Sequence, residues 1–516
     1  MLEDRVYRIG TFSRWHVLLL ACLVAGPPVR AAGPSIDSLV EARLAKLGIQ
    51  PALLCSDATF LRRVHLDLTG RLPARDRVVR FLDARAPDKR ARLIDELLAS
   101  PAAADLATMR WCDVLRVKSE FPINLWPRAA AAYHRWVHRA LADGWRYDRF
   151  ARALLTASGS SVRDPPVNFF RAVTPHHPAG IARAVALTFM GSRIERWEPA
   201  RREGLAKLFS RVAFKSTSEW KEEIVLPDPR PAAAFTATLP DGTSVNVPAA
   251  ADPRKPFADW LVRADNRWFA RAVANRTWAW LCGRGLVEEP DDLRPDNPPV
   301  HPELLAFLEE EVARSGFDLV HLQRLILNSR TYQRDCRPQA RRPEAVSLGA
   351  HVVPRRLDAE VIIDAIDDVT GTSEAYWSQI PEPFTIVPEA QRTIELTDGS
   401  ISSPFLELFG RPARDTGLAR ERSNAVTPEQ VQHLQNSTRL TRKIASSSVL
   451  KALAREHWRD PGRLVEELYL RCLSRRPTPA ETGTAVAHLR SRFIRGPAVE
   501  DLVWALINTQ EFLYRH

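Results

Sequence analysis

Cysteine is scarce in this sequence, and no two cysteines have the spacing of a metal or haem motif. The 516 residues contain six cysteines, none of them in C-x-x-C or C-x-x-C-H spacing. Five remain once the N-terminal segment described below is set aside, at positions 55, 112, 282, 336 and 472. The odd number disfavours a disulfide-dense scaffold, and the spacing disfavours a cysteine zinc site or an attached c-type haem. Buried free thiols are the simpler expectation.

Long runs of basic residues are also missing, although the chain is basic. The net charge is +11, but the 73 basic and 62 acidic residues are interleaved. We therefore expect no nucleic-acid partner, whereas an acidic polysaccharide or an anionic surface remains compatible with the charge. Phosphate-loop, G-x-S-x-G and H-E-x-x-H motifs are absent as well, so the sequence predicts no cofactor and no metal.

The N-terminus has the pattern of an export signal. Three arginines precede the apolar run "WHVLLLACLVAG", and small residues near positions 31 and 32 offer a cleavage site. This run is too short to span a bilayer comfortably. Residues 1–32 are therefore predicted to be a signal peptide, with export to the periplasm or cell surface. Membrane association is expected only if the signal stays uncleaved or if Cys22, which ends the lipoprotein-like "LLAC", is lipidated.

Helical periodicity dominates the remainder. Segments such as "SIDSLVEARLAKLGI" and "HPELLAFLEEEVARSG" place apolar residues at i, i+3 and i+4, which predicts a mainly α fold. The exception is "AAAFTATLPDGTSVNVPAA", where two β-prone runs flank a Pro-Asp-Gly turn. We predict two helical domains, 33–226 and 257–516, separated by a linker with a small β-hairpin at 227–256. A second irregular region at about 373–404 is predicted to be a loop with short strands.

Long stretches of the chain resemble a known pair of domains. The first match rests on "FLRRVHLDLTGRLP", "DKRARLIDELLASP", "YDRFARALLTASGS" and "PPVNFFRAV". The second rests on "NRTWAWLCGRGLVEEPDDLRPDNPPVHPELL", "RRLDAEVIIDAIDDVTG" and "LFGRPARDT". These segments resemble the tandem domains of unknown function of exported planctomycete-type proteins, often found behind a planctomycete-type cytochrome c domain. The resemblance implies class and compartment, not a reaction.

The chain departs from this family at two cysteine motifs. The resemblance implies a C-x-x-C-H-x-H-P stretch near Glu195, but "SRIERWEP" contains neither cysteine nor histidine. It also implies a Cys-x-Cys where this chain has Leu418 and Arg420. Because both motifs are missing together, we hypothesise that they serve one metal or redox centre in relatives, which this protein has lost. The cytochrome c domain is absent too.

The first candidate site is "DDLRPDNPPVHPELL". Its carboxylates, Asp291 and Asp292, could bind a cation or act as acid and base, and Arg294 could bind a carboxylate or sulfate. Asn297 could orient a substrate, and His301 could move protons. A structural interpretation competes, because Asp and Asn before proline form turns and Arg294 could pair with either neighbouring acid.

The helix before this stretch and a later segment add further candidates. Asn275 and Arg276 lie in "NRTWAWLCGRG", whose tryptophans could stack on a sugar ring but are more often core residues. Arg422 and Asn436 match positions of the family, in "RERSN" and "HLQNS". No base or orienting group can be assigned beside Ser423, so a turn or capping role is favoured there.

Two further patterns receive structural interpretations. His134 and His138 have the i, i+4 spacing of zinc helices, but no H-E-x-x-H motif accompanies them, so we expect a solvated pair. Asp67 precedes a helix-ending Thr-Gly, and Arg62 or Arg63 is available to pair with it.

Three functional classes remain open. The favoured class is a non-catalytic scaffold or binding protein in polysaccharide uptake or breakdown, whose partner is an acidic polysaccharide or another exported protein. The alternatives are a hydrolase or lyase on acidic or sulfated polysaccharide, and a degenerate member of a redox or haem-associated family. The first is favoured because no complete nucleophile–base set or metal constellation is visible. Convergence of Arg276, Asp291, Asp292, His301 and Arg422 in one cleft would favour a ligand site or enzyme.

Overall fold

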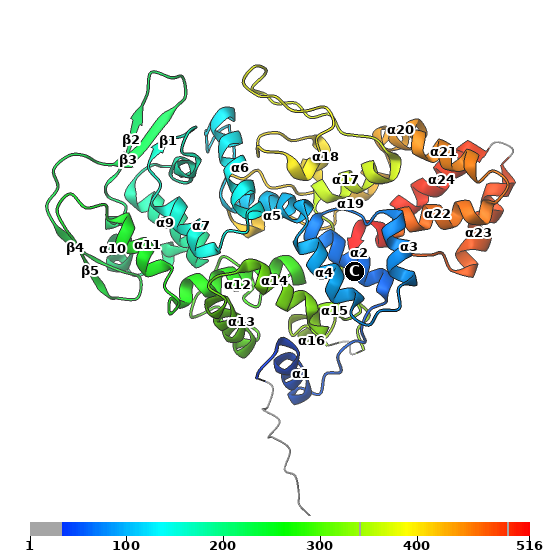
Figure 1. The fold of residues 1–516 in the computed structure, drawn as a ribbon, viewed down its shortest axis with the longest axis horizontal. Helices are drawn as coiled ribbons and strands as arrows, with labels where there is room; N and C mark the ends of the chain where they lie inside the picture. Colours follow the sequence, from blue (N-terminus) through cyan, green and yellow to red (C-terminus); the bar gives the residue numbers. More distant parts are fainter. Residues whose placement is uncertain (1–32, 340–341, 493–494) are drawn as a thin grey trace, which may run out of the picture. The chain divides into compact units, whose positions relative to one another are not determined.

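Amphipathic helices account for most of the chain, as the periodicity predicts (Figure 1). The computed structural model describes residues 33–339, 342–492 and 495–516, so the predicted signal at 1–32 lies outside the described residues. Ten helices precede residue 208 in this part of the chain: α1 (Ile36–Lys46), α2 (Asp57–Thr69), α3 (Arg75–Asp83), α4 (Lys89–Leu98), α5 (Pro101–Val114), α6 (Pro127–Ala142), α7 (Tyr147–Leu155), α8 (Asn168–Arg171), α9 (Pro178–Met190) and α10 (Pro199–Lys207).

The later helices follow the hairpin region. Between residues 254 and 370 lie α11 (Arg254–Leu261), α12 (Arg267–Cys282), α13 (Pro302–Arg314), α14 (Leu319–Asn328), α15 (Arg330–Gln333), α16 (Pro343–Ser347) and α17 (Ala359–Thr370). Towards the C-terminus lie α18 (Pro404–Leu408), α19 (Pro428–Asn436), α20 (Thr438–Ser446), α21 (Ser448–Glu456), α22 (Pro461–Leu473), α23 (Pro479–Ser491), α24 (Arg495–Ile507) and α25 (Gln510–Leu513). Short 3-10 turns occur at Pro165–Val167 (η1), Ile194–Arg196 (η2), Thr393–Glu395 (η3) and Ala419–Glu421 (η4).

Strands are few and short. The predicted hairpin is present as β4 (Phe235–Thr238) and β5 (Ser244–Val247), paired antiparallel with Phe235 opposite Val247. A second hairpin was not predicted: β2 (Val212–Ser216) pairs with β3 (Glu223–Pro227), which also pairs with β1 (Gly159–Ser160). Finally, β6 (Arg355–Arg356) pairs with β7 (Tyr514–Arg515). The described residues of 373–404 contain the 3-10 turn η3 rather than the expected short strands.

The hydrophobic core is continuous across the predicted linker. Residues Ser35–His516 form one compact unit by their contacts. One apolar cluster draws its residues from Ile36 to Ala350, with Leu470. A second combines α17 to α25 with Leu66, Leu106 and Met109 of the N-terminal helices. The linker at 227–256 therefore marks the β4–β5 hairpin, while packing joins the segments on either side of it.

Buried ionic contacts tie α2 to the C-terminal segment, which lies beside it in Figure 1. Arg515 Nε lies 2.8 Å from the Asp67 carboxylate, and the Tyr332 hydroxyl donates to the same group at 2.8 Å. The expected partners, Arg62 and Arg63, instead donate to main-chain carbonyls, which corrects that interpretation: Arg62 donates to α22 and α25, and Arg63 to Tyr332 and the C-terminal residue. Sequence proximity favoured them, but both side chains point toward the later helices.

The histidine pair on α6 is not solvated as expected. His134 is 8% exposed, and burial lowers its pKa to about 3. His138 remains partly exposed, with Nε2 3.1 Å from an Asp105 carboxylate oxygen. The expectation was wrong for His134 because its side of the helix packs inward.

The five cysteines outside residues 1–32 are free thiols, as expected. Within the described ranges, no helix combines the length and the apolar character needed to cross a membrane.

Candidate functional site

The loop that carries the first candidate residues begins where α12 ends at Gly283, whose φ of 87° suits glycine. Asn275, fully buried on α12, fixes the start of this loop: its amide donates to the Val287 carbonyl at 3.2 Å and accepts from the Val287 N–H at 3.0 Å. Asn297 closes the far side by donating to the carbonyls of Glu288 and Asp292. Both asparagines therefore satisfy backbone groups of the loop.

His301 acts as the N-terminal cap of α13. Its Nδ1 accepts from the Leu304 N–H at 3.2 Å, and Nε2 lies 3.1 Å from the Leu39 carbonyl. The side chain is 3% exposed and lines a small cavity beside Tyr332, not the cavity of Asp291. Both ring nitrogens are thus committed to backbone atoms, which leaves no free nitrogen for proton transfer.

Asp292 and Arg294 pair locally. Arg294 Nε lies 2.9 Å from the Asp292 carboxylate, and its Nη1 lies 2.8 Å from Asp296. Asp292 is buried and also lies 3.8 Å from Arg193. These contacts match the structural interpretation of the loop.

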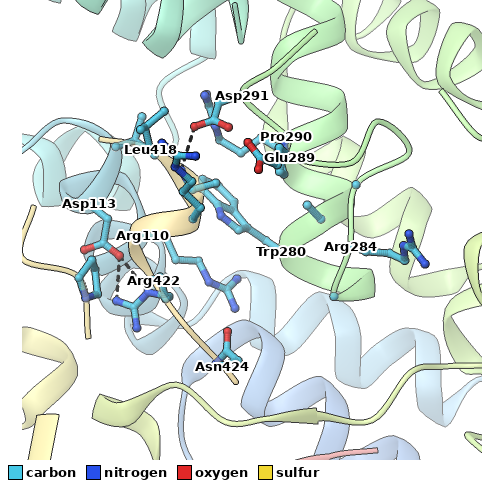
Figure 2. A pocket seen from close by; sticks show the side chains of 18 of the residues that line it. Arg110, Asp113, Trp280, Arg284, Glu289, Pro290, Asp291, Leu418, Arg422 and Asn424 are labelled. Carbon is cyan, nitrogen blue, oxygen red and sulfur yellow. Dashed lines mark hydrogen bonds and ion pairs between the residues drawn. The ribbon is translucent and has the colours of Figure 1, made fainter. Parts of the chain in front are cut away.

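Asp291 has a different role, because its partners come from distant segments. It is 1% exposed; one carboxylate oxygen lies 3.3 Å from Arg193, and the other accepts from the Ala419 N–H at 2.9 Å (Figure 2). Ala419 begins η4 and lies between Leu418 and Arg420, where the resemblance implies the two cysteines of a Cys-x-Cys. Asp291 therefore anchors η4 against the α12–α13 loop.

Arg422, directly after η4, lies in a buried ionic network. Its guanidinium lies 2.8 Å from Asp113 and 2.7 Å from Glu360. Burial by itself would lower the pKa of Arg422, but the charges of Asp113 and Glu360 raise it well above the ordinary value. Figure 2 shows Arg422 beside Asp113, with Asp291 and Leu418 in another part of the same view.

These segments surround a cavity of about 470 Å³, hereafter the arginine cavity. Convergence of five candidate residues in one cleft would favour a ligand site. Three of them, Arg276, Asp291 and Arg422, line this cavity, whereas Asp292 and His301 do not. Arg276 donates to the carbonyls of Leu187 and Thr188 near the end of α9. It thereby satisfies carbonyls that the helix leaves unpaired.

Every carboxylate that lines the arginine cavity lies beside an arginine. Each has an arginine nitrogen within 4 Å: Asp113 has Arg414 and Arg422, Glu288 has Arg284, Glu289 and Asp291 have Arg193, and Asp358 has Arg422. Burial by itself would raise the pKa of Asp358, but nearby arginine charges hold it below its usual range. None of these acids is thus left as a free general base.

Three arginines at the cavity have no such partner. Within the described chain, Arg110, Arg355 and Arg420 have no carboxylate oxygen within 4 Å. Arg110 donates to the Asp67 carbonyl at 3.2 Å and lies 5.9 Å from the ring centre of Trp280, which also lines the cavity. The unpaired guanidinium groups make the cavity suitable for an anion.

Sequence reasoning did not single out Arg110 and Arg355, because they lie far apart in the chain and no motif marks them. It named Arg420 only as a position of the missing Cys-x-Cys, not as an anion-binding residue. It did point to the tryptophans of α12, of which Trp280 is half-buried at the cavity and Trp278 is buried in the core. Asn436 is exposed at the end of α19 and does not line the cavity. No group of three or more His, Cys, Asp or Glu among the described residues is arranged to hold a metal.

The two positions of the missing cysteine motifs lie at one second cavity, also of about 470 Å³. Ser192, Arg193 and Glu195 line it from the η2 side, and Leu418 and Arg420 line it from the η4 side. Two motifs at these positions would face the same space, as the hypothesis of one shared centre in relatives requires. In this chain, the η2 side carries serine, arginine and glutamate, and the η4 side carries leucine and arginine.

Comparison with known proteins identifies two families, and neither has a known activity. The family PSCyt2, described as "Protein of unknown function (DUF1549)", matches residues 35–200. PSD1, described as "Protein of unknown function (DUF1553)", matches residues 253–489. No curated protein and no solved structure matches. The chain therefore belongs to the planctomycete-type proteins that carry these two domains of unknown function in tandem.

Proposed function

We propose that this protein is an exported, non-catalytic binding protein for acidic polysaccharide, and that the arginine cavity holds an acidic group of the polymer. The observation that carries this proposal is the set of three unpaired arginines, Arg110, Arg355 and Arg420, around one cavity. A guanidinium binds a carboxylate or sulfate through two parallel hydrogen bonds, so three of them favour an anion over a neutral ligand.

Trp280 favours a ligand in which the acidic group belongs to a sugar. Its ring is half-buried, packs edge-on against Trp111 at 5.5 Å, and is exposed in part to the cavity. A fixed aromatic face beside charged donors offers a sugar ring an apolar surface while its acidic group pairs with arginine.

The non-catalytic part of the proposal rests on the neutralised carboxylates. A hydrolase or lyase needs a carboxylate or another base that can accept a proton. Each acid at the arginine cavity is held by arginine, and His301 is committed to backbone atoms elsewhere. Export is supported by the sequence pattern of residues 1–32.

The test is a titration of purified protein with oligogalacturonates and chondroitin sulfate oligosaccharides, with maltooligosaccharides as neutral ligands. The acidic oligosaccharides should bind and the neutral ones should not. Arg355→Gln should weaken binding by roughly 10- to 100-fold, because hydrogen bonds between charged groups contribute about 1.5–3 kcal/mol. Arg355 forms no side-chain hydrogen bond within the described residues, so the fold should tolerate this change.

Arg442→Gln is the matched control, because Arg442 is an exposed arginine on α20 that does not line the cavity. It should leave binding unchanged. Equal binding of neutral and acidic oligosaccharides would contradict the proposal. Release of shortened or unsaturated products would contradict its non-catalytic part and favour the hydrolase or lyase alternative.

A further inference from the structure

Three cavities of this protein form one row. The arginine cavity shares Leu418 and Arg420 with the second cavity, so the two cavities are adjacent at the start of η4. The second cavity in turn shares Pro122, Ile123 and Thr174 with a third cavity of about 660 Å³ beside the β2–β3 turn. The shared residues place the three cavities side by side, in the order arginine cavity, second cavity, third cavity.

The far end of the row is an exposed aromatic surface. Trp220, in the turn between β2 and β3, is 62% exposed, and Phe384 is 46% exposed. Their ring centres are 5.1 Å apart, and the ring of Trp126 lies 4.6 Å from Trp220. We call Trp126, Trp220 and Phe384 the aromatic platform. Single exposed aromatic residues are ordinary, but exposed rings in contact with one another form a patch of the kind that marks an interaction surface.

Backbone conformation sets the platform apart as well. Asn124, Trp126 and Lys221 have φ values of 61°, 70° and 60°, a region that residues other than glycine rarely adopt. Such conformations cost free energy and persist where surrounding structure holds them, often at binding sites. Their clustering at one surface is independent of the exposure of the rings.

The chemistry beside the platform favours a sugar chain. Hydroxyl and amide groups of Ser216, Thr217, Ser218 and Asn124 line the third cavity next to Trp220. Lys221 Nζ lies 5.4 Å from the ring centre of Trp126 and has no carboxylate oxygen within 4 Å in the described chain. Aromatic faces and hydroxyl partners complement a polyhydroxylated ligand, and Lys221 adds a cation. Glu219, Glu222 and Glu223 line the same cavity, so the acidic unit of the ligand is assigned to the arginine cavity and the platform contacts the face of a sugar ring. The hydrocarbon of a membrane would leave the hydroxyl groups unpaired.

We infer that one polysaccharide chain occupies this row along several sugar units, from the arginine cavity past Ile123 to the aromatic platform. This inference rests on the proposed function, because it assumes that an acidic unit is held by the unpaired arginines. It adds that the ligand is a polymer recognised over its length, and that Trp220 contributes to the binding of long chains only.

The experiment compares a short oligogalacturonate of three units with a long one of twelve, by calorimetry on the full chain. Wild-type protein should bind the long chain at least about tenfold more tightly, because the platform adds a second contact on the same molecule. Trp220→Ala should remove this gain and leave the affinity for the trimer unchanged. A long chain can also bind a single site in several alignments, which raises its affinity without any contact at the platform. The decisive quantity is therefore the ratio of long-chain to short-chain affinity in wild type, compared with the same ratio in Trp220→Ala.

Trp377→Ala is the matched control, since Trp377 is 67% exposed and lines none of the three cavities. It should keep the gain. An equal gain in wild type and Trp220→Ala, or an equal loss in both tryptophan variants, would overturn the row while leaving the arginine cavity as a site for short acidic sugars. Absence of binding to either length would overturn the proposed function and this inference together. Unchanged thermal midpoints would show that both variants are folded.

Discussion

Replacement of Arg422 by methionine tests the ionic network behind the arginine cavity. The guanidinium lies 2.8 Å from Asp113 and 2.7 Å from Glu360, whose side chain is 1% exposed. Removal of one partner from a buried ion pair leaves the other charge uncompensated and costs about 3–5 kcal/mol. Two neighbours reduce that cost, because Arg414 lies 2.9 Å from Asp113 and Arg411 lies 3.3 Å from Glu360. We therefore expect the lower end, a loss of about 3 kcal/mol in the free energy of unfolding.

The assay is urea unfolding followed by tryptophan fluorescence, with comparison of midpoints at unchanged slope. The matched control is Arg263→Met, because Arg263 pairs with Asp265 and both side chains are more than half exposed. An exposed pair contributes at most about 1 kcal/mol, so the control should change stability little. A loss for Arg422→Met no larger than that of the control would refute the reasoning, and it would free Arg422 for a role in ligand binding.

The remaining predictions concern pH and export. Burial lowers the pKa of His65 and of His134 to about 3, from 6.5 in the unfolded chain. As the pH falls, the unfolded state therefore binds these protons before the folded state does. The contribution of the two histidines to the free energy of unfolding should be fully present above pH 6.5 and should decrease as the pH falls toward 3. Between pH 7 and pH 5, wild type should lose about 2 kcal/mol more than His134→Gln in urea unfolding, and an equal loss in both proteins would contradict the assignment. For export, the intact mass of protein recovered from a bacterial periplasm should correspond to a chain that begins near residue 33, and retention of Met1 would contradict signal cleavage.

Asp364 has the opposite effect to the histidines on the pH dependence of stability. For this reason wild type is compared with His134→Gln. Burial raises the pKa of this carboxyl to about 6, from 3.8 in the unfolded chain. The folded state then binds that proton first, so Asp364 adds stability as the pH falls through 6. The difference between wild type and His134→Gln cancels this opposing contribution.

Local sequence patterns determined the helical class of this protein and one of its two larger hairpins, while the β2–β3 hairpin was not predicted. Helical periodicity predicted the mainly α fold, and a Pro-Asp-Gly turn between β-prone runs predicted β4 and β5. The second half of "DDLRPDNPPVHPELL" was also interpretable, since Asn297 closes a turn and His301 caps α13. These features depend on residues a few positions apart, whose geometry the chain itself fixes.

Tertiary structure alone decided the site. Asp291 accepts a hydrogen bond from Ala419, which is 128 residues away in the sequence. Arg422 contacts Asp113, which is 309 residues away. The unpaired arginines are recognisable only when every carboxylate nearby has been placed, and the burial of His134 depends on which face of α6 packs inward. The sequence by itself thus determined the helices, the hairpin and the family. Tertiary structure decided which charges are neutralised, because ion pairing and desolvation depend on distances between segments that no local pattern encodes.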